Sequence, residues 1–188
     1  MDMGALLSAP LAAGESDGMS ADELARFNAL PPAAAREALL ACCNSLAWAD
    51  RMAAGRPYSS ARDAARQSGA IVAMLTESDL ADALAGHPRI GERAGGPARS
   101  AEWSRAEQSA AAKADDETRR ELAESNLEYE RKFGHVYLVC AAGRSAAELL
   151  SVLRSRLGND RRREWLVVRG ELQKINEIRL VKMLAGTR

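Results

Sequence analysis

The chain has 188 residues, which is the length of one domain with a short tail. Apolar residues make up 47% and charged residues 28%, and Lys+Arg and Asp+Glu balance at 26 each. This balance disfavours a uniformly basic nucleic-acid-binding protein and a polybasic membrane-surface protein, because both need excess positive charge. No stretch approaches about 18 uninterrupted apolar residues, so the sequence predicts no membrane span.

The three cysteines indicate a reducing compartment. Cys42 and Cys43 are adjacent within an apolar run and Cys140 is far from both, which does not suit a disulfide framework. The sequence contains neither a CxxC nor an HExxH motif, so we expect no dedicated metal site. These features together predict a cytoplasmic protein.

The N-terminal residues 1–18 are rich in Gly, Ser and Ala, and their first charge is Asp2 rather than the positive charge that a signal peptide carries. We therefore expect a disordered leader at 1–18, followed by one folded domain at 19–186.

The composition of the domain favours an all-α fold, because Ala, Leu, Glu and Arg dominate while aromatic and β-branched residues are sparse. A capping-box spacing of Ser20 and Glu23 predicts the start of the first helix. The chain is expected to form a single compact domain of about eight helices, at 20–28, 33–43, 45–54, 60–75, 79–85, 100–132 with a break near 114–115, 145–157 and 160–184.

Two stretches interrupt this helical pattern. Residues 86–97 place four glycines and two prolines around His87, a composition typical of a loop. Residues 136–143 have the only strand-like composition in the chain. Since no second strand exists to pair with them, we expect a short irregular segment near 135–142 that crosses the core, either extended or as a buried helical turn.

Three polar features are candidates for chemistry. His87, followed by Pro88, can transfer a proton near neutral pH, although a loop histidine without a role fits the same pattern. Ser104, Glu107 and Gln108 share one face of a predicted helix, where a merely solvated face is the alternative. Arg179 follows an apolar stripe of the last helix, so it either holds an anion or extends its charge into water.

In their order along the chain, several motifs resemble one family, the OHCU decarboxylases, which act on 2-oxo-4-hydroxy-4-carboxy-5-ureidoimidazoline (OHCU). The resemblance extends over residues 20–185. The motifs are Phe27-Asn28-Ala29-Leu30-Pro31, Leu39-Leu40-Ala41-Cys42-Cys43-Asn44-Ser45 with Trp48, His87-Pro88-Arg89-Ile90-Gly91, Ser104-x-x-Glu107-Gln108, Tyr129-x-x-Lys132-Phe133-Gly134 and Glu171-x-x-Lys174-Ile175-x-x-x-Arg179-Leu180.

The resemblance implies a carboxy-lyase of urate and purine breakdown that converts OHCU to S-allantoin and CO2. It further implies an all-helical fold, no metal or organic cofactor, a small-molecule substrate, no nucleic acid or membrane partner, and a homodimer. His87, Glu107 and Arg179 match the family's catalytic positions, with Glu107 expected to orient His87. Substrate contacts are expected from Pro88, Ser104 and Gln108 and from the backbone at His135, Val136, Tyr137, Leu138 and Val139.

The chain departs from the family pattern at two places. Many members have a Phe-Gly-Phe-Pro-Phe run where this chain reads Phe133-Gly134-His135-Val136-Tyr137, and many have Asp where it has Arg89. Two alternatives therefore stay open: a non-catalytic helical interaction module, and a lyase or hydrolase of altered substrate on the same scaffold. An enzyme requires His87, Glu107 and Arg179 to meet around one pocket, whereas an interaction module leaves them scattered.

Overall fold

The computed structural model describes residues 15–91, 98–109 and 114–185, and every regular element within these ranges is an α-helix. The nine helices of the described part are α1 (Glu15–Ala29), α2 (Pro32–Cys42), α3 (Leu46–Ala54), α4 (Ala61–Met74), α5 (Glu77–Ala85), α6 (Ala98–Glu107), α7 (Asp116–Phe133), α8 (Ala146–Arg156) and α9 (Arg161–Ala185). The predicted all-α fold is confirmed, with nine helices in place of about eight. None of these helices is both long enough and apolar enough to cross a membrane.

Side-chain caps set where most of the helices begin. A hydroxyl or carboxylate oxygen of the residue before the helix accepts a backbone N–H of the first turn at Ser45, Ser60, Thr76, Asp115 and Ser145. Each such cap contributes about 1 kcal/mol by satisfying an amide that has no partner inside the helix. Gly134 ends α7 in the left-handed region, at a φ of 80°, where a side chain would be strained.

The first helix differs from its prediction. α1 begins at Glu15, ahead of the Ser20 start that the capping-box spacing suggested, so residues 15–18 of the expected leader are helical. The remainder of the expected leader, residues 1–14, and part of the predicted loop, residues 92–97, lie outside the described residues.

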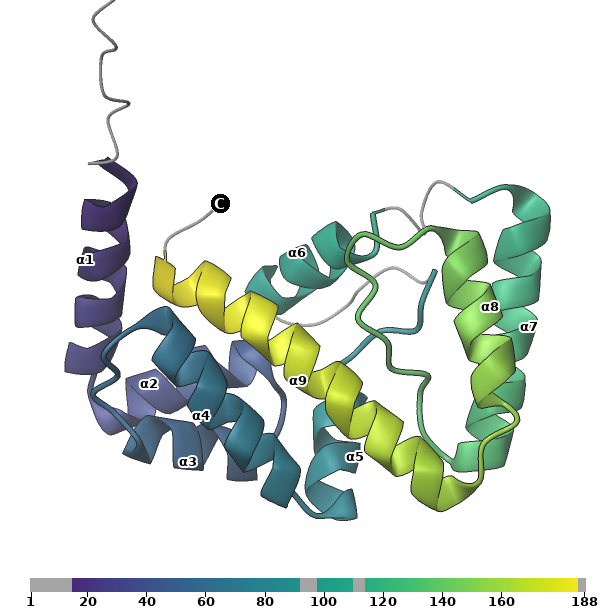
Figure 1. Cartoon of the computed structure of the whole chain (residues 1–188), viewed down its shortest axis with the longest axis horizontal. Helices are drawn as coiled ribbons and strands as arrows, with labels where there is room; N and C mark the ends of the chain where they lie inside the picture. Colours follow the sequence, from purple (N-terminus) through teal and green to yellow (C-terminus); the bar gives the residue numbers. More distant parts are fainter. Residues whose placement is uncertain (1–14, 92–97, 110–113, 186–188) are drawn as a thin grey trace, which may run out of the picture.

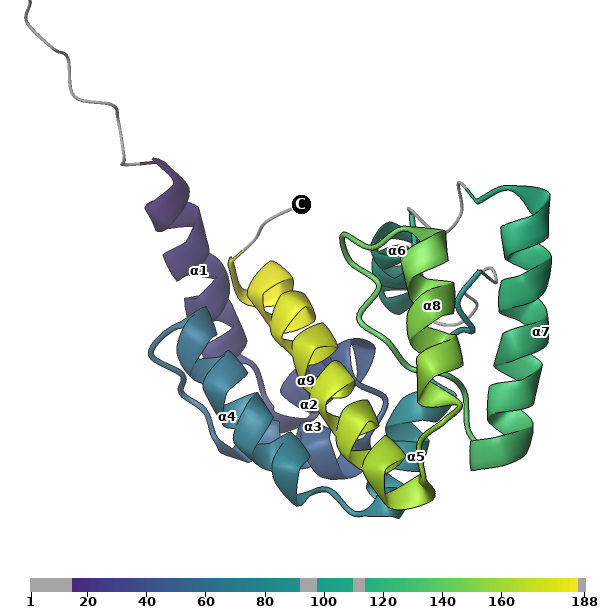
Figure 2. The same cartoon turned by 45° about the vertical axis from the view of Figure 1, so that its right-hand side comes forward.

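The helices enclose two hydrophobic cores. α9 runs diagonally across the molecule and packs along α4 and α1, whereas α7 and α8 lie side by side at one end (Figures 1 and 2). The first core, formed mainly by α1–α5 and α9, has its largest buried side chains at Leu39, Trp48, Met52, Leu80, Leu84, Leu172 and Leu180. The second core, formed mainly by α7 and α8, has them at Leu122, Tyr129, Tyr137, Leu149 and Leu153.

Residues 136–141, which we call the seam segment, run between these two cores without forming a helix. Alternate residues pack against the first core, namely Val136, Leu138 and Cys140. The residues between them pack in the second core, namely Tyr137, Val139 and Ala141. An alternation with a period of two is the signature of extended backbone. The predicted irregular core segment is therefore confirmed, and of its two expected forms the extended one is observed.

Candidate active site

His87 lies directly after α5, and the last turn of that helix holds its ring. The backbone N–H of His87 donates to the Leu84 carbonyl at 2.9 Å, and ring Nδ1 lies 2.9 Å from the Ala83 carbonyl oxygen. A carbonyl oxygen only accepts, so Nδ1 carries the proton and Nε2 is the unprotonated nitrogen. Nε2 is buried and forms no hydrogen bond with any described residue. The ring therefore keeps a free lone pair.

The surroundings of His87 also keep its imidazole neutral. Burial, and after it the positive charge of Arg179, lowers the pKa of His87 to about 4, although the bond to Ala83 acts in the opposite direction. The ring is consequently uncharged throughout the physiological pH range. A neutral imidazole with a free nitrogen is a general base.

A close contact between two segments fixes the backbone before His87. A Cβ atom added to Gly86 would lie 2.4 Å from Cβ of Asn44, nearer than two such atoms can approach. Asn44 also donates from Nδ2 to the Asp82 carbonyl at 3.1 Å, so it is tied to α5. The α2–α3 connection and the end of α5 thus fit together only because position 86 has no side chain.

Arg179 of α9 is buried and held by three partners. Its Nε and Nη2 donate to the two carboxylate oxygens of Glu107 at 2.9 and 2.8 Å, a bidentate pair. Its Nη1 donates to the Cys42 carbonyl at 3.0 Å, and Nη2 also donates to Ser104 Oγ at 3.2 Å. We expected Glu107 to orient His87, but its carboxylate orients Arg179 instead, since the guanidinium fork uses both oxygens.

The loop after His87 is held by hydrogen bonds from two sides, one from the residue after α6 and one from α7. The N–H of Gly91 donates to Gln108 Oε1 at 3.0 Å, and Asn126 of α7 donates from Nδ2 to the Ile90 carbonyl at 3.2 Å. Gly91 has a φ of 89°, which a glycine adopts without strain. Gln108, expected as a substrate contact, therefore also shapes the loop.

Arg89, where this chain departs from the family pattern, is directed at α7. Its Nε and Nη2 donate to the carboxylate of Glu130 at 2.6 and 2.8 Å. The hydrogen bond from Arg89 lowers the pKa of Glu130 below its usual value. The pair is a third attachment of the loop.

These groups meet around one pocket. Its lining residues are His87, Pro88, Ile90, Ser104, Glu107, Gln108, Tyr137, Leu138, Val139, Ala141, Ile175 and Arg179. The lining thus contains every predicted site residue except His135 and Val136. Residues far apart in the sequence come together here, whereas an interaction module would have left them scattered.

His135 and Val136 lie outside this lining because they belong to other contacts. The His135 ring packs on Trp165 with centroids 4.5 Å apart, and its Nδ1 is bonded to the Val136 carbonyl at 3.0 Å. The Val136 side chain packs against the first core. A substrate contact from either residue stays a prediction.

A sequence model of OHCU decarboxylase matches residues 28–181, which is most of the chain. The chain belongs to the OHCU decarboxylase family. Every residue of the pocket lining falls within the matched range. The family expected from the sequence motifs is therefore confirmed.

Solved structures and a curated relative agree with this family. A crystal structure described as OHCU decarboxylase in the presence of (S)-allantoin is 29% identical, with a TM-score of 0.67 over 77% of this chain and 95% of that chain. The uric acid degradation bifunctional protein TTL of Arabidopsis thaliana is 31% identical over 77% of this chain, which spans only 45% of that protein's length. An (S)-allantoin synthase structure, 16% identical with a TM-score of 0.62 over 85% of this chain and 53% of that chain, shares the fold.

Sequence reasoning missed several residues around this OHCU decarboxylase pocket. Ile90, Ala141 and Ile175 complete the lining, and Gly86 with Asn44 sets the place of His87. Gly86, directly before the His-Pro motif, was a usable signal for the end of a helix and for a close contact, because glycine is common at helix ends and has no side chain. Its contact with Asn44 had no signal, because it joins two segments that are remote in the sequence.

Proposed function

We propose that this chain catalyses the decarboxylation of OHCU to (S)-allantoin and CO2 in urate breakdown, without a cofactor. One observation carries the proposal: His87, whose buried Nε2 has no partner among the described residues, and the Arg179–Glu107 pair line the same small pocket. Membership of the OHCU decarboxylase family supports the same reaction.

The substrate's own structure explains why no external electron sink is needed. OHCU bears a carboxyl and a hydroxyl group on one ring carbon, next to the carbon that carries the ureido group and is double-bonded to a ring nitrogen. When the C–CO2 bond breaks, its electron pair forms a C=C bond to the neighbouring carbon, and the π electrons of the C=N bond move onto the ring nitrogen. A proton must then leave the hydroxyl group, and a proton must reach the ureido-bearing carbon, which becomes the stereocentre.

His87 suits both proton movements. Its neutral Nε2 accepts the hydroxyl proton, and the resulting imidazolium is a strong acid because the pKa of His87 is about 4. That imidazolium then gives the proton to the ureido-bearing carbon from one face, so one enantiomer of allantoin is formed. The proton taken from oxygen is returned to carbon, and the ring nitrogen that receives the electron pair takes one further proton from solvent, which balances the charge that the carboxylate left behind.

Arg179 suits the negative charge of the reaction. Four of its N–H groups are committed to Glu107, Cys42 and Ser104, so its guanidinium is held in place at the pocket wall. A positive charge fixed before the reaction stabilises the anion that forms when CO2 leaves, without first having to reorganise. Glu107 acts through Arg179 in this scheme.

The experiment is a coupled assay in which urate oxidase and hydroxyisourate hydrolase generate OHCU from urate. Spontaneous decay of OHCU gives racemic allantoin, so a circular dichroism signal reports enzymatic turnover. We expect rapid appearance of one enantiomer only when this protein is added. A racemic product at the uncatalysed rate would contradict the proposal and leave the altered-substrate alternative in its place.

We also infer from the family resemblance a homodimer, and from the cysteine pattern a cytoplasmic location. Light scattering coupled to size-exclusion chromatography tests the first inference, with a mass of twice 20.2 kDa as the expected result. A folded domain at 19–186 is proposed from the family resemblance, which extends over residues 20–185. Limited proteolysis tests its boundaries.

A further inference from the structure

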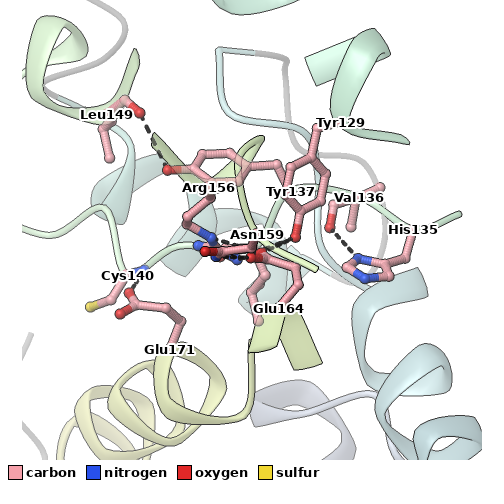
Figure 3. Close-up of polar contacts among 11 residues, drawn as sticks. Tyr129, His135, Val136, Tyr137, Cys140, Leu149, Arg156, Asn159, Glu164 and Glu171 are labelled. Atoms are coloured by element: carbon pink, nitrogen blue, oxygen red, sulfur yellow. Dashed lines mark hydrogen bonds and ion pairs between the residues drawn. The ribbon is translucent and has the colours of Figure 1, made fainter. Parts of the chain in front are cut away.

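A buried network of charged and polar side chains lies behind the pocket, outside its lining. Arg156 of α8 and Glu164 of α9 are 5% and 0% exposed, and Arg156 Nε donates to Glu164 Oε1 at 2.8 Å. The Tyr129 hydroxyl donates to the same carboxylate oxygen, and Asn159 Nδ2 donates to Oε2 at 2.6 Å (Figure 3). The proposed reaction uses none of these residues directly.

This network is attached to the seam segment. Arg156 Nη1 donates to the Leu138 carbonyl at 2.7 Å, and the guanidinium lies over the Tyr137 ring, 4.8 Å from its centroid. Two residues further on, the Cys140 N–H donates to Glu171 Oε2 at 2.8 Å (Figure 3). Glu164 and Glu171 are seven residues apart on α9, so they lie on one face of that helix.

Alternate residues of an extended chain present their N–H and C=O groups to the same edge. The Leu138 carbonyl and the Cys140 N–H form hydrogen bonds with α8 and α9, so they lie on one edge of the seam segment. The N–H and C=O groups of Tyr137 and Val139 therefore lie on its opposite edge. The N–H of Val139 donates no hydrogen bond to any described residue. Tyr137, Leu138 and Val139 all line the pocket.

We propose that Arg156, Glu164 and Glu171 are positioning residues, which fasten one edge of the seam segment so that the opposite edge presents the Val139 N–H to the substrate. This inference rests on the proposed function, because an OHCU-like ring has the carbonyl and ring-nitrogen acceptors that such a donor would meet. Buried donors that are fixed in advance favour an anion strongly.

A role in stability alone does not account for this arrangement. A buried ion pair recovers little net stability, because its attraction is offset by the loss of hydration of both charges. Here Arg156 binds the Leu138 carbonyl and Glu171 binds the Cys140 N–H. Both groups belong to the seam segment, which forms a wall of the pocket.

The test compares three variants in the coupled assay. Glu171→Gln keeps the side-chain volume but loses the charge, and Arg156→Lys loses the guanidinium fork. Ser68→Ala is the control: it removes a buried hydrogen bond to Trp48, at 3.1 Å, from a residue outside the pocket lining. KM, kcat, the enantiomeric ratio of allantoin, the thermal midpoint and amide hydrogen exchange at 137–140 are measured for each.

We expect Glu171→Gln and Arg156→Lys to raise KM about five- to tenfold, the equivalent of one weakened hydrogen bond, and to lower the enantiomeric ratio. The amides of 137–140 should exchange faster in both variants. Ser68→Ala should lower the thermal midpoint while leaving KM, the enantiomeric ratio and exchange at 137–140 as in the wild type.

Two results overturn the proposal in distinguishable ways. If the wild type turns over OHCU and both variants keep its KM and enantiomeric ratio while only the thermal midpoint falls, the network is structural and the positioning role is lost. If the wild type itself does not turn over OHCU, the proposed function fails, and the positioning role fails with it.

Discussion

The two nitrogens of the His87 ring have different tasks. Nδ1 is fixed by the Ala83 carbonyl, which sets both the orientation and the tautomer of the ring, and Nε2 is buried without a partner among the described residues. Leaving a buried nitrogen unpaired costs about 1–3 kcal/mol of folding stability. Such a cost is typical of functional sites, where the missing partner is supplied by the substrate.

Replacement of this ring tests its role. His87→Gln keeps a polar side chain but cannot accept and return a proton, so we expect kcat/KM to fall by at least about 100-fold. Far-UV circular dichroism should retain the wild-type helicity. Unchanged turnover would remove His87 from the reaction, whatever the structure of the variant.

The low pKa of His87 predicts how activity depends on pH. The ring must be neutral to act as a base, so kcat/KM should be flat near neutrality and should fall only as the pH approaches about 4. The pH profile is measured by adding OHCU that was formed beforehand from urate, so that the two coupling enzymes do not limit the rate. A fall centred near pH 6.5, the ordinary value for histidine, would show that the ring is hydrated rather than buried.

The same shift predicts how stability depends on pH. Between pH 6.5 and about 4 the unfolded chain binds a proton at His87 and the folded chain does not, so this group lowers the free energy of unfolding as the pH decreases. His87→Gln lacks the effect. In urea unfolding, its stability relative to the wild type should therefore be higher at pH 5 than at pH 7. An unchanged difference would contradict the lowered pKa.

At the scale of helices, the end of α5 decides where His87 lies. Gly86→Ala would place a methyl group 2.4 Å from Cβ of Asn44, so one of the two segments must move. We expect kcat/KM to fall about 10-fold or more, since small displacements of a catalytic group are costly. The double variant Gly86→Ala/Asn44→Gly removes the clash and should recover part of the activity. Absence of any recovery would mean that the contact is not what positions the ring.

At a second glycine, Gly170, we expect replacement by alanine to be favourable. Gly170 lies inside α9, and a Cβ added there would meet no atom within 4 Å. Gly170→Ala should therefore stabilise the protein by about 0.5–1 kcal/mol, because alanine loses less backbone freedom when the helix forms. Thermal unfolding measures the gain, and a lower midpoint would indicate a steric constraint absent from this structure.

Local signals explain why most helices could be predicted. Ser60, Thr76 and Ser145 are capping residues within a few positions of the helices that they start, so their effect is visible in the sequence. The start of α1 was predicted too late, because the helix begins ahead of the apparent cap at Ser20. The seam segment was recognised by its composition, but its extended form follows from the two cores on either side.

Long-range partners explain what the site prediction lacked. His87, Glu107 and Arg179 were identified through their family motifs, yet the pairing of Glu107 with Arg179 joins residues of α6 and α9. The bond between Arg156 and the Leu138 carbonyl equally depends on tertiary packing. A sequence pattern contains the residue types for such pairs but not the distances between them.

At the scale of the whole molecule, the seam segment packs in both cores, and α9 of the first core is hydrogen-bonded to it through Glu171. Trp48 and Trp165 lie in the first core, whereas Leu153 of α8 lies in the second and is fully buried. Elements shared in this way should make the two cores unfold together.

A truncation in the second core tests this coupling. Leu153→Ala should cost about 2–5 kcal/mol and should shift the tryptophan fluorescence transition, which reports mainly on the first core, as far as the circular dichroism transition. Two separate transitions in urea would show that the cores are independent.

The spacing of residues along α9 has one more consequence. Glu164, Glu171 and Arg179 work from a single rod, and each added or missing residue would turn everything beyond it by about 100°. An insertion between Glu171 and Arg179 would turn the guanidinium away from the pocket, while Glu164 and Glu171 kept their contacts with Arg156 and the seam segment. The number of residues between Glu171 and Arg179 is therefore constrained more strictly than the identity of the residues between them.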